Sequence, residues 1–471
     1  MALLSRLSLA LRVVCISFRN GYSSGGTGGL TVAGRLSEDP AVSVLVIEAG
    51  ADDRDNPAIF DIYEFTVAEN TPLDWQYPAE NWRIINSGKT LGGCSSINAQ
   101  YDTWATLLEP SEAHVGWNWN GMLHYMRKSE NFMPPTADQI AKGAQSIPAV
   151  QGSLGPVHSA FSYGMYGGPQ QPAFLASATN ASGVVHCPDL SAGNPNCVTM
   201  NPLSINYNDR PSSSVEAYLT PVEKTRKNWV TLTQHLVTRI VWTGMKSPLV
   251  ASGVEFATYT NTTNGTTRFT AHARREVIVA AGAIRTPSVL QLSGIEQVSS
   301  IANDLAPPEL KPIQTNTIMA AGGTGFPVNG TGPNNAIAYP NFFQIFGNAS
   351  DAKAAEVGNS IKTWAASQAA NGHSATALET IFRAQADIVL KDKAPMVEMF
   401  YITGPDVAVD QIVTNLWQLL PFSRRRLEIV STDPFEYPNI RVNYFNVSFD
   451  MDVQVAGLQL LRKIFRTPPF R

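Results

Sequence analysis

A glycine-rich turn near the N-terminus constrains the fold of this chain more than any other feature. Residues Ser24 to Leu30 read Ser-Gly-Gly-Thr-Gly-Gly-Leu, and a later apolar run, Val44 to Ile47, ends at Glu48. Glycine lets a backbone approach a pyrophosphate at a helix N-terminus, and an acid at the end of the next strand accepts hydrogen bonds from a ribose. The pattern predicts a dinucleotide-binding βαβ unit in which Ser24 takes the place of the first glycine.

Length and charge limit the classes of protein to which the chain can belong. Its 471 residues, 44% hydrophobic and 15% charged, suit a globular enzyme of about two domains. The net charge is -4, the pI is about 6.0, and the sequence contains no basic patch, so we expect no nucleic-acid partner. The sequence holds no run of 18 apolar residues, so we expect no membrane span.

Acceptor sites for N-linked glycans favour a secretory or extracellular location. The motif Asn-x-Ser/Thr occurs six times, which predicts a secreted glycoprotein; the asparagines are Asn180, Asn261, Asn264, Asn329, Asn348 and Asn446. Cys187 and Cys197 lie close in sequence, and either a disulfide or two free thiols fits them. The loose group His186, Cys187 and Cys197 does not predict a metal site.

The first 18 residues admit two interpretations. They carry mostly apolar residues with Arg6 and Arg12 among them, and Arg12 interrupts what would be the hydrophobic region of a signal peptide. The run from Val13 to Phe18 is alternatively the first strand of the βαβ unit. One segment cannot be both a cleaved leader and a buried strand.

Two further glycine-containing segments carry chemical information. In Gly88 to Asn98, two adjacent glycines and small residues suit a backbone that passes close to a planar ligand, or a tight surface loop. An apolar strand at 277–281 runs into Gly282 to Ile295, where a helix has Pro287 near its first turn and ends at Ser293 and Gly294.

Residue patterns predict the remaining elements. Strands are expected at 230–233, 237–242, 253–258, 267–271, 277–281, 397–402, 427–431 and 440–444. Helices are expected at about 210–219, 286–293, 351–369, 375–390 and 452–466. The segments 50–86, 140–210 and 301–345 read as irregular or loop-like.

Taken in order, these segments resemble the glucose-methanol-choline (GMC) oxidoreductases, from about Ser24 to the end of the chain. Residues Gly26 to Leu36 look like the ADP-binding turn and helix of that family. Gly88 to Asn98 is similar to its first signature and Gly282 to Ile295 to its second, with Glu296 in place of a final glycine. Trp417 to Arg424 resembles the glucose oxidase, aryl-alcohol oxidase and patulin-synthase-like branch.

The resemblance implies FAD as cofactor and assigns roles to matching positions. Gly26, Thr27, Gly28 and Gly29 would contact the pyrophosphate, and Glu48 with Ala49 the ribose. The backbone of Val237 would contact the adenine. The flavin would lie against the turn that contains Gly92, Gly93, Asn98, Ala99 and Tyr101.

The implied fold is α/β, with a Rossmann-like FAD-binding domain and a second α+β domain whose antiparallel sheet is flanked by helices. We expect residues 1–150 and 151–300 to form the two parts of the FAD domain, with 151–209 rich in loops, and 301–471 to bind the substrate. The first strand and the glycine turn are separated by Arg19 to Ser23, which predicts an incomplete FAD domain.

The implied activity is oxidation of the CH–OH group of a small-molecule alcohol or sugar, in secondary metabolism, with oxygen or a quinone as electron acceptor. The family uses a histidine near its C-terminus as the base, whereas the last histidine here is His373. We therefore expect the C-terminal catalytic segment to be absent and nominate no catalytic or metal-binding residue. The alternative interpretation is an inactive remnant or an incomplete gene model.

Overall fold

The computed structural model describes most of the chain. The described residues are 11–16, 26–61, 67–68, 70–91, 118–165, 167–244, 249–260, 265–295, 318–321, 335–369, 374–402 and 411–471. The chain divides into two compact units, each built from three separate stretches. Unit 1 comprises 1–97, 211–310 and 425–442, and unit 2 comprises 98–210, 311–424 and 443–471. The sequence predicted contiguous ranges, 1–150 and 151–300 for FAD binding and 301–471 for substrate binding, whereas each unit combines stretches that are separated in sequence. The assignment of these ranges to cofactor or substrate binding stays a prediction.

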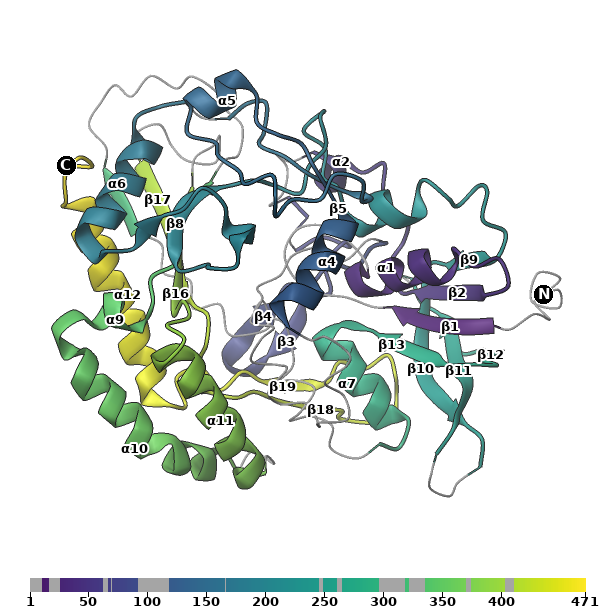
Figure 1. Cartoon of the computed structure of the whole chain (residues 1–471). Helices are drawn as coiled ribbons and strands as arrows, with labels where there is room; N and C mark the ends of the chain where they lie inside the picture. The colour runs from purple at the N-terminus through teal and green to yellow at the C-terminus, as the bar shows by residue number, and fades with distance from the viewer. Residues whose placement is uncertain are drawn as a thin grey trace. The chain divides into compact units, whose positions relative to one another are not determined.

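A parallel sheet with a crossover helix organises unit 1. Strand β1 (Leu11–Ile16) leads through helix α1 (Thr27–Leu36) to strand β2 (Ser43–Glu48), and β1 pairs in parallel with β2. The full strand order is β13-β1-β2-β9, with β9 at Trp229–Leu232 and β13 at Val277–Ala280 (Figure 1). The predicted βαβ unit is therefore present. The segment assigned at 13–18 is the central strand β1, two residues earlier than expected.

Burial explains why this sequence forms these elements. Every residue of β2 is buried, as a continuous apolar strand requires in a parallel sheet covered on both faces. Helix α1 turns Leu30 and Ala33 into the core, and neither side chain is exposed. A Cβ atom added at Gly34 would lie 2.8 Å from the ring of Tyr218, so the absence of a side chain there permits close packing against 215–219.

The other elements of unit 1 surround this sheet. They are an antiparallel sheet of β10 (His235–Trp242), β11 (Ala251–Thr258) and β12 (Phe269–His272); the hairpins β3 (Tyr77–Ala79) with β4 (Arg83–Ile85) and β18 (Arg426–Glu428) with β19 (Asn439–Arg441); helices α2 (Pro57–Phe60) and α7 (Gly282–Leu292); the short helix η2 (Glu80–Trp82); and the π-helical turn η5 (Val215–Leu219). Strands β9 to β13 all fall within two residues of their predicted starts.

A six-stranded sheet forms the centre of unit 2, in the order β14-β17-β16-β15-β8-β7. All pairings in it are antiparallel except that between β7 and β8. The strands are β7 (Val185–His186), β8 (Cys197–Asn201), β14 (Ile318–Ala321), β15 (Asn335–Ala338), β16 (Val397–Ile402) and β17 (Gln411–Gln418). The predicted α+β unit with an antiparallel sheet is confirmed.

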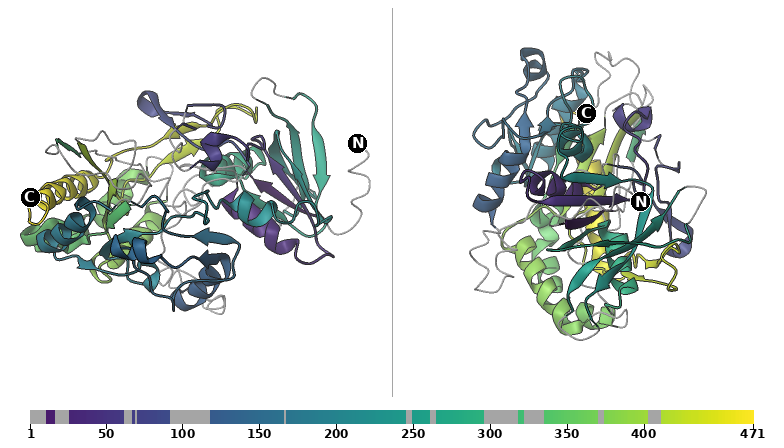
Figure 2. Two further views of the ribbon diagram at one scale, coloured as in Figure 1. Left: turned by 90° about the horizontal axis from the view of Figure 1, so that it is seen from above. Right: turned by 90° about the vertical axis from the view of Figure 1, so that its right-hand side faces the viewer.

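Helices flank this sheet, and α10 and α11 run side by side (Figure 2). Helix α12 packs on β16 and β17, where Val397 and Val453 belong to one buried cluster. The helices are α4 (Trp119–Ser129), α5 (Ala137–Ala141), α6 (Gln170–Ser182), α9 (Phe342–Phe346), α10 (Ser350–Ala369), α11 (Ala375–Leu390) and α12 (Ser448–Phe465), with short turns η4 (Leu190–Ala192) and η7 (Gly347–Ala349). The remaining strands are β5 (Glu130–Phe132) and β6 (Val157–Ser159).

Several expectations for irregular regions were wrong. The stretch 140–210 contains α6 and β8, and 301–345 contains β14 and β15. Helix α6 is rich in alanine, glutamine and serine, and it buries Phe174, Leu175, Ala178 and Ala181 in a core that it shares with α12 and β15. Strand β17 was missed altogether. Helix α7 begins at Gly282, so Pro287 lies inside it, and the predicted helix at 210–219 is limited to η5.

The two cysteines at 187 and 197 are joined by a disulfide, which resolves the alternatives left by the sequence. The bridge ties β7 to the start of its parallel neighbour β8. Cys187 is therefore not free to bind a metal ion. An oxidising compartment is the usual setting for such a bond.

Asp450 holds the segment before Arg424 against α12. This fully buried carboxylate accepts hydrogen bonds from the backbone N–H groups of Phe422 and Ser423, both at 2.8 Å, and from the side-chain amide of Gln418 at 3.1 Å. Burial raises the pKa of Asp450, and these donors oppose the rise.

We predict that Asp450→Ala lowers the free energy of unfolding by about 2 to 4 kcal/mol, because two buried N–H groups lose their acceptor. Asp450→Asn keeps one acceptor oxygen and should cost less. Urea denaturation of both variants measures the difference. Equal losses would contradict this expectation and show that one amide oxygen cannot replace the carboxylate at this position.

Candidate functional site

Helix α1 presents an open N-terminus at the expected glycines. Gly26 precedes the helix in the left-handed conformation, with φ of 67°, which glycine adopts without strain. Apart from its chain neighbours and the backbone of its own helix, a Cβ atom added at Gly28 would meet no atom of the described residues within 4 Å. The first N–H groups of a helix have no partner within it and carry partial positive charge, so the space beside Gly28 suits an anion.

Glu48 lies at the end of β2, and its side chain is fully buried. The backbone N–H of Gly50 donates to Oε1 at 2.6 Å, whereas Oε2 is buried without any hydrogen-bond partner. Burial raises the pKa of Glu48 well above its ordinary value; the Gly50 N–H opposes this shift and the charge of Asp53 adds to it. Oε2 is thus an acceptor that the protein itself leaves unused.

The loop after Glu48 runs against the start of the first signature. A Cβ atom added at Gly50 would lie 2.4 Å from the backbone nitrogen of Thr90, so only glycine fits there. The N–H of Leu91 donates to the carbonyl of Ala51 at 2.9 Å, and Ala51 bridges Thr90 in parallel. The loop after Glu48 and the start of the first signature, which are about 40 residues apart in sequence, are therefore adjacent in unit 1.

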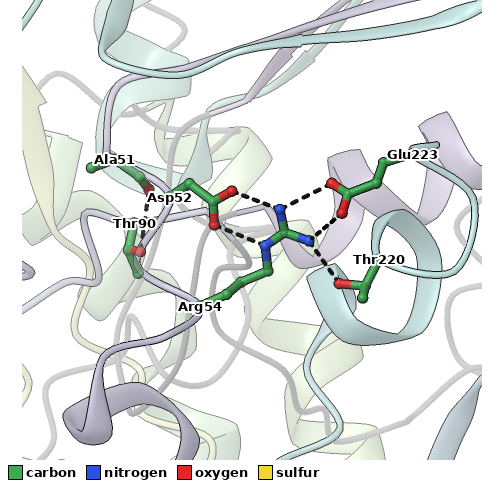
Figure 3. Close-up of polar contacts among 6 residues, drawn as sticks. All are labelled: Ala51, Asp52, Arg54, Thr90, Thr220 and Glu223. Atoms are coloured by element: carbon green, nitrogen blue, oxygen red, sulfur yellow. Dashed lines mark hydrogen bonds and ion pairs between the residues drawn. The ribbon is translucent and has the colours of Figure 1, made fainter.

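Arg54 fastens the same loop to the segment that follows η5 (Figure 3). Its guanidinium donates to both carboxylate oxygens of Asp52, at 2.8 and 2.6 Å, and to both of Glu223, at 3.0 and 2.9 Å. A fifth bond goes to the hydroxyl of Thr220 at 2.9 Å. These forked pairs lower the pKa of Asp52 and raise that of Arg54, so the loop is held by charge-assisted bonds.

A pocket opens beside the buried acid. Ala49, which directly follows Glu48, lines it together with Val237 of β10 and Ala281 at the start of α7. The other lining residues are His235, Leu236, Arg285, Ser288, Val289, Leu292 and Pro434. This mainly apolar lining suits a flat heteroaromatic ring.

The structure brings together the described members of the predicted cofactor site. Thr27, Gly28 and Gly29 form the first turn of α1, while Glu48, Ala49 and Val237 lie at the acid and its pocket. The predicted flavin-facing residues Gly92, Gly93, Asn98, Ala99 and Tyr101 lie outside the described residues, as does Ser24. The geometry fits the adenosine and pyrophosphate half of a dinucleotide, since an orphan acceptor, an apolar pocket and an open helix end occur in one unit.

Sequence reasoning missed two arginines of this region. Arg54 donates hydrogen bonds to Glu223 and Arg285 donates one to Pro434, and both partners are remote in sequence. No local sequence pattern reveals such contacts. The side chain of Arg285 is 2% exposed and lines the pocket.

A buried carboxyl group lies in the sheet of unit 2. Glu398 of β16 is buried and hydrogen-bonded to Tyr339 and Trp417, and burial raises its pKa to about 7. Its neighbours Val397 and Met399 belong to the core that includes α12, so Glu398 points to the opposite face of the sheet.

Other classes of site find no support in the part of the chain that the structure describes. There, no three histidine, cysteine, aspartate or glutamate side chains group in a way that would hold a metal ion. A helix with the length and apolarity to cross a bilayer is also missing from those ranges. Among the sequons, Asn180, Asn348 and Asn446 are exposed, while Asn261, Asn264 and Asn329 lie outside the described residues.

Comparison with known proteins agrees with this geometry. Residues 21–317 match the family model described as GMC oxidoreductase. The chain is 30% identical to a glucose oxidase of Penicillium chrysogenum, over 94% of this chain and 74% of that protein. It is 32% identical to a glucose oxidase-like protein of Humicola fuscoatra, over 95% of this chain and 78% of the relative.

Solved structures share the fold. An FAD-dependent oxidoreductase from Chaetomium thermophilum superposes with a TM-score of 0.76 at 25% identity, covering 98% of this chain and 83% of that one. A fungal aryl-alcohol oxidase superposes with a TM-score of 0.75 at 22% identity, with the same coverage.

We predict that Glu48→Gln makes the nucleotide-free protein more stable at neutral pH. A raised pKa in the folded state means that Glu48 favours folding below its unfolded pKa of about 4.5, and that this contribution is lost as the pH rises. The amide cannot ionise, so the gain of the variant over the wild type should grow between about pH 5 and pH 8. Urea denaturation across that range tests this, and a constant difference would contradict it.

We further predict that Gly28→Ala weakens binding of ADP without lowering the stability of the free protein, since the new methyl group enters open space that a phosphate would need. Gly34→Ala is the matched control within the same helix, because its methyl group would strike Tyr218 and destabilise the protein by about 1 to 3 kcal/mol. Calorimetric titration and thermal melting separate the two effects. Unchanged ADP affinity in Gly28→Ala would exclude a phosphate there.

Proposed function

The chain belongs to the GMC oxidoreductases, and we propose that it oxidises the CH–OH group of a small-molecule alcohol. FAD is the cofactor of this family, and when bound it supplies a hydride acceptor. One observation carries the assignment of the site. The buried Glu48 has an acceptor oxygen without a protein partner, beside an apolar pocket in the same unit as the open end of α1.

Different residues of unit 1 would bind different parts of the cofactor. Thr27, Gly28 and Gly29 would receive the pyrophosphate at the helix N-terminus. Glu48 would accept hydrogen bonds from the ribose through Oε2, and the pocket at Ala49 and Val237 would exclude water from the adenine. In the first signature, Gly92, Gly93, Asn98, Ala99 and Tyr101 are proposed to face the flavin.

For the substrate we propose a primary alcohol on an aromatic or polyketide-like molecule, or a sugar, with oxygen or a quinone as electron acceptor. The glucose oxidase and aryl-alcohol oxidase among the similar proteins support these two classes. A role in secondary metabolism is part of this proposal. Removal of a hydride requires that the hydroxyl proton also leave.

A secretory or extracellular location is also proposed. The disulfide between Cys187 and Cys197 supports it, as do the exposed sequon asparagines Asn180, Asn348 and Asn446. A glycan-specific mobility shift on enzymatic deglycosylation of the secreted protein would test this location.

We predict that the purified protein shows an oxidised flavin absorption spectrum, which a substrate alcohol bleaches under anaerobic conditions. An aryl alcohol and glucose are the first two substrates to compare, and admission of oxygen or a quinone identifies the acceptor by recovery of the spectrum. A folded protein without flavin would refute the proposed cofactor site, and flavin that no alcohol bleaches would favour a nucleotide-binding protein without this activity.

A further inference from the structure

One guanidinium joins the loop that follows Glu48 to a distant segment of unit 1. All five N–H donors of Arg54 are used: two bind Asp52 within the loop, two bind Glu223, and one binds Thr220 (Figure 3). Thr220 and Glu223 lie 166 and 169 residues away in sequence. A guanidinium with every donor satisfied has little freedom to reorient, so it holds the two segments in one arrangement.

The segment that Arg54 reaches also supports helix α1. Residues 215–228, which we call the brace, begin with η5 and continue in hydrogen-bonded turns. From the brace, Nη1 of Arg226 donates to the carbonyl oxygen of Gly34 at 2.7 Å and to the hydroxyl of Ser37 at 3.0 Å. The side-chain amide of Asn228 donates to three carbonyl oxygens in the turn between α1 and β2. The brace therefore fixes the end of α1 and the turn that leads to β2.

The same contacts govern where the carboxyl group of Glu48 lies relative to the open end of α1. Core packing holds β2 against α1, but the chain leaves the sheet directly after Glu48. The N–H of Gly50 binds Oε1 of Glu48 at 2.6 Å, and the loop then continues to Asp52 and Arg54. Arg54 thereby ties the loop that orients the carboxyl group to the brace. The brace is tied in turn to α1, whose first turn is the proposed phosphate site.

A stabilising role alone does not account for this arrangement. Partly exposed ion pairs contribute little to stability, because water screens them and because ordering long side chains costs entropy. The side chains of Arg54, Asp52 and Glu223 are 19%, 39% and 31% exposed. What the forked geometry supplies is direction, since each carboxylate accepts two bonds from one rigid plane.

We propose that Arg54 is a positioning residue for the nucleotide half of the cofactor: through the brace it fixes the spacing between Glu48 and the first turn of α1. A ligand with both a ribose and a pyrophosphate must meet the two sites at once, and it binds tightly where their spacing is preset. A ligand with a ribose alone has no such requirement. This inference rests on the proposed cofactor site and adds to it a residue that acts through other residues.

The test compares ADP, which would span both sites, with adenosine, which would reach the acid and its pocket but not α1. Calorimetry measures both affinities, and the thermal midpoint is measured without ligand. The variants are Arg54→Gln, Arg54→Lys, Glu223→Gln and the double variant of Arg54→Gln with Glu223→Gln. Lys353→Gln is the matched control, because Lys353 likewise bonds two carboxylates, Glu356 of its own helix at 2.8 Å and Asp452 of α12 at 2.6 Å, but lies in unit 2.

We expect Arg54→Gln to weaken ADP binding by roughly 10-fold and adenosine binding by less than about 2-fold, and Glu223→Gln to do the same. These two changes alter the local charge in opposite directions, so a purely electrostatic effect would strengthen ADP binding in Glu223→Gln, whereas loss of the link weakens it in both. The double variant should bind ADP no more weakly than either single variant, since both open the same link. Arg54→Lys, with three donors instead of five, should bind ADP with intermediate affinity, and Lys353→Gln should bind it as the wild type does.

Equal losses of ADP and adenosine affinity would overturn the inference, because Arg54 would then act on the acid and not on the spacing. A lower thermal midpoint with unchanged ADP affinity would also overturn it and make Arg54 purely structural. Tighter ADP binding in Glu223→Gln, or additive losses in the double variant, would show that the two residues do not act through one link. A wild type that binds neither ADP nor adenosine would instead refute the proposed cofactor site.

Discussion

The buried carboxyl group of Glu48 is the constraint on which the rest of unit 1 depends. It ends a strand with every residue buried, and one oxygen is held by the N–H of Gly50 while the other has no partner. A group in this position is costly for a protein that binds nothing, because burial disfavours its charged form. The cost is understandable where a ligand with hydroxyl donors completes the site, as ribose does.

The surroundings of Glu48 keep that geometry rigid. Gly50 lets the following loop approach Thr90 more closely than any side chain would allow, and Arg54 joins the loop to Glu223 through paired hydrogen bonds. These contacts bring the βαβ unit and the first signature side by side. The proposed cofactor site thus consists of three stretches of chain whose packing, more than their local sequence, positions the acceptor.

The sequence predicted the elements that depend on local residue patterns. It missed those that depend on contacts between residues far apart in the chain. The apolar run of β2, the helix α1 and the acid at the strand end follow from periodicity and from glycine chemistry, so they were found, and with them FAD and the family. Strand β17 was missed, and so was helix α6, whose large buried apolar side chains are Phe174 and Leu175 and whose partners α12 and β15 are remote in sequence. Arg285 was missed because the aromatic rings around its guanidinium belong to Trp75, Tyr77 and Tyr437, remote positions that only the fold brings together.

The central claim is that unit 1 binds the adenosine half of FAD at Glu48. A crystal structure of the chain with FAD tests it most directly. The account predicts a ribose hydroxyl within hydrogen-bond distance of Oε2 of Glu48, the adenine in the pocket at Val237, and the pyrophosphate at the N-terminus of α1. An adenosine group bound elsewhere, with Oε2 still unpartnered, would contradict it.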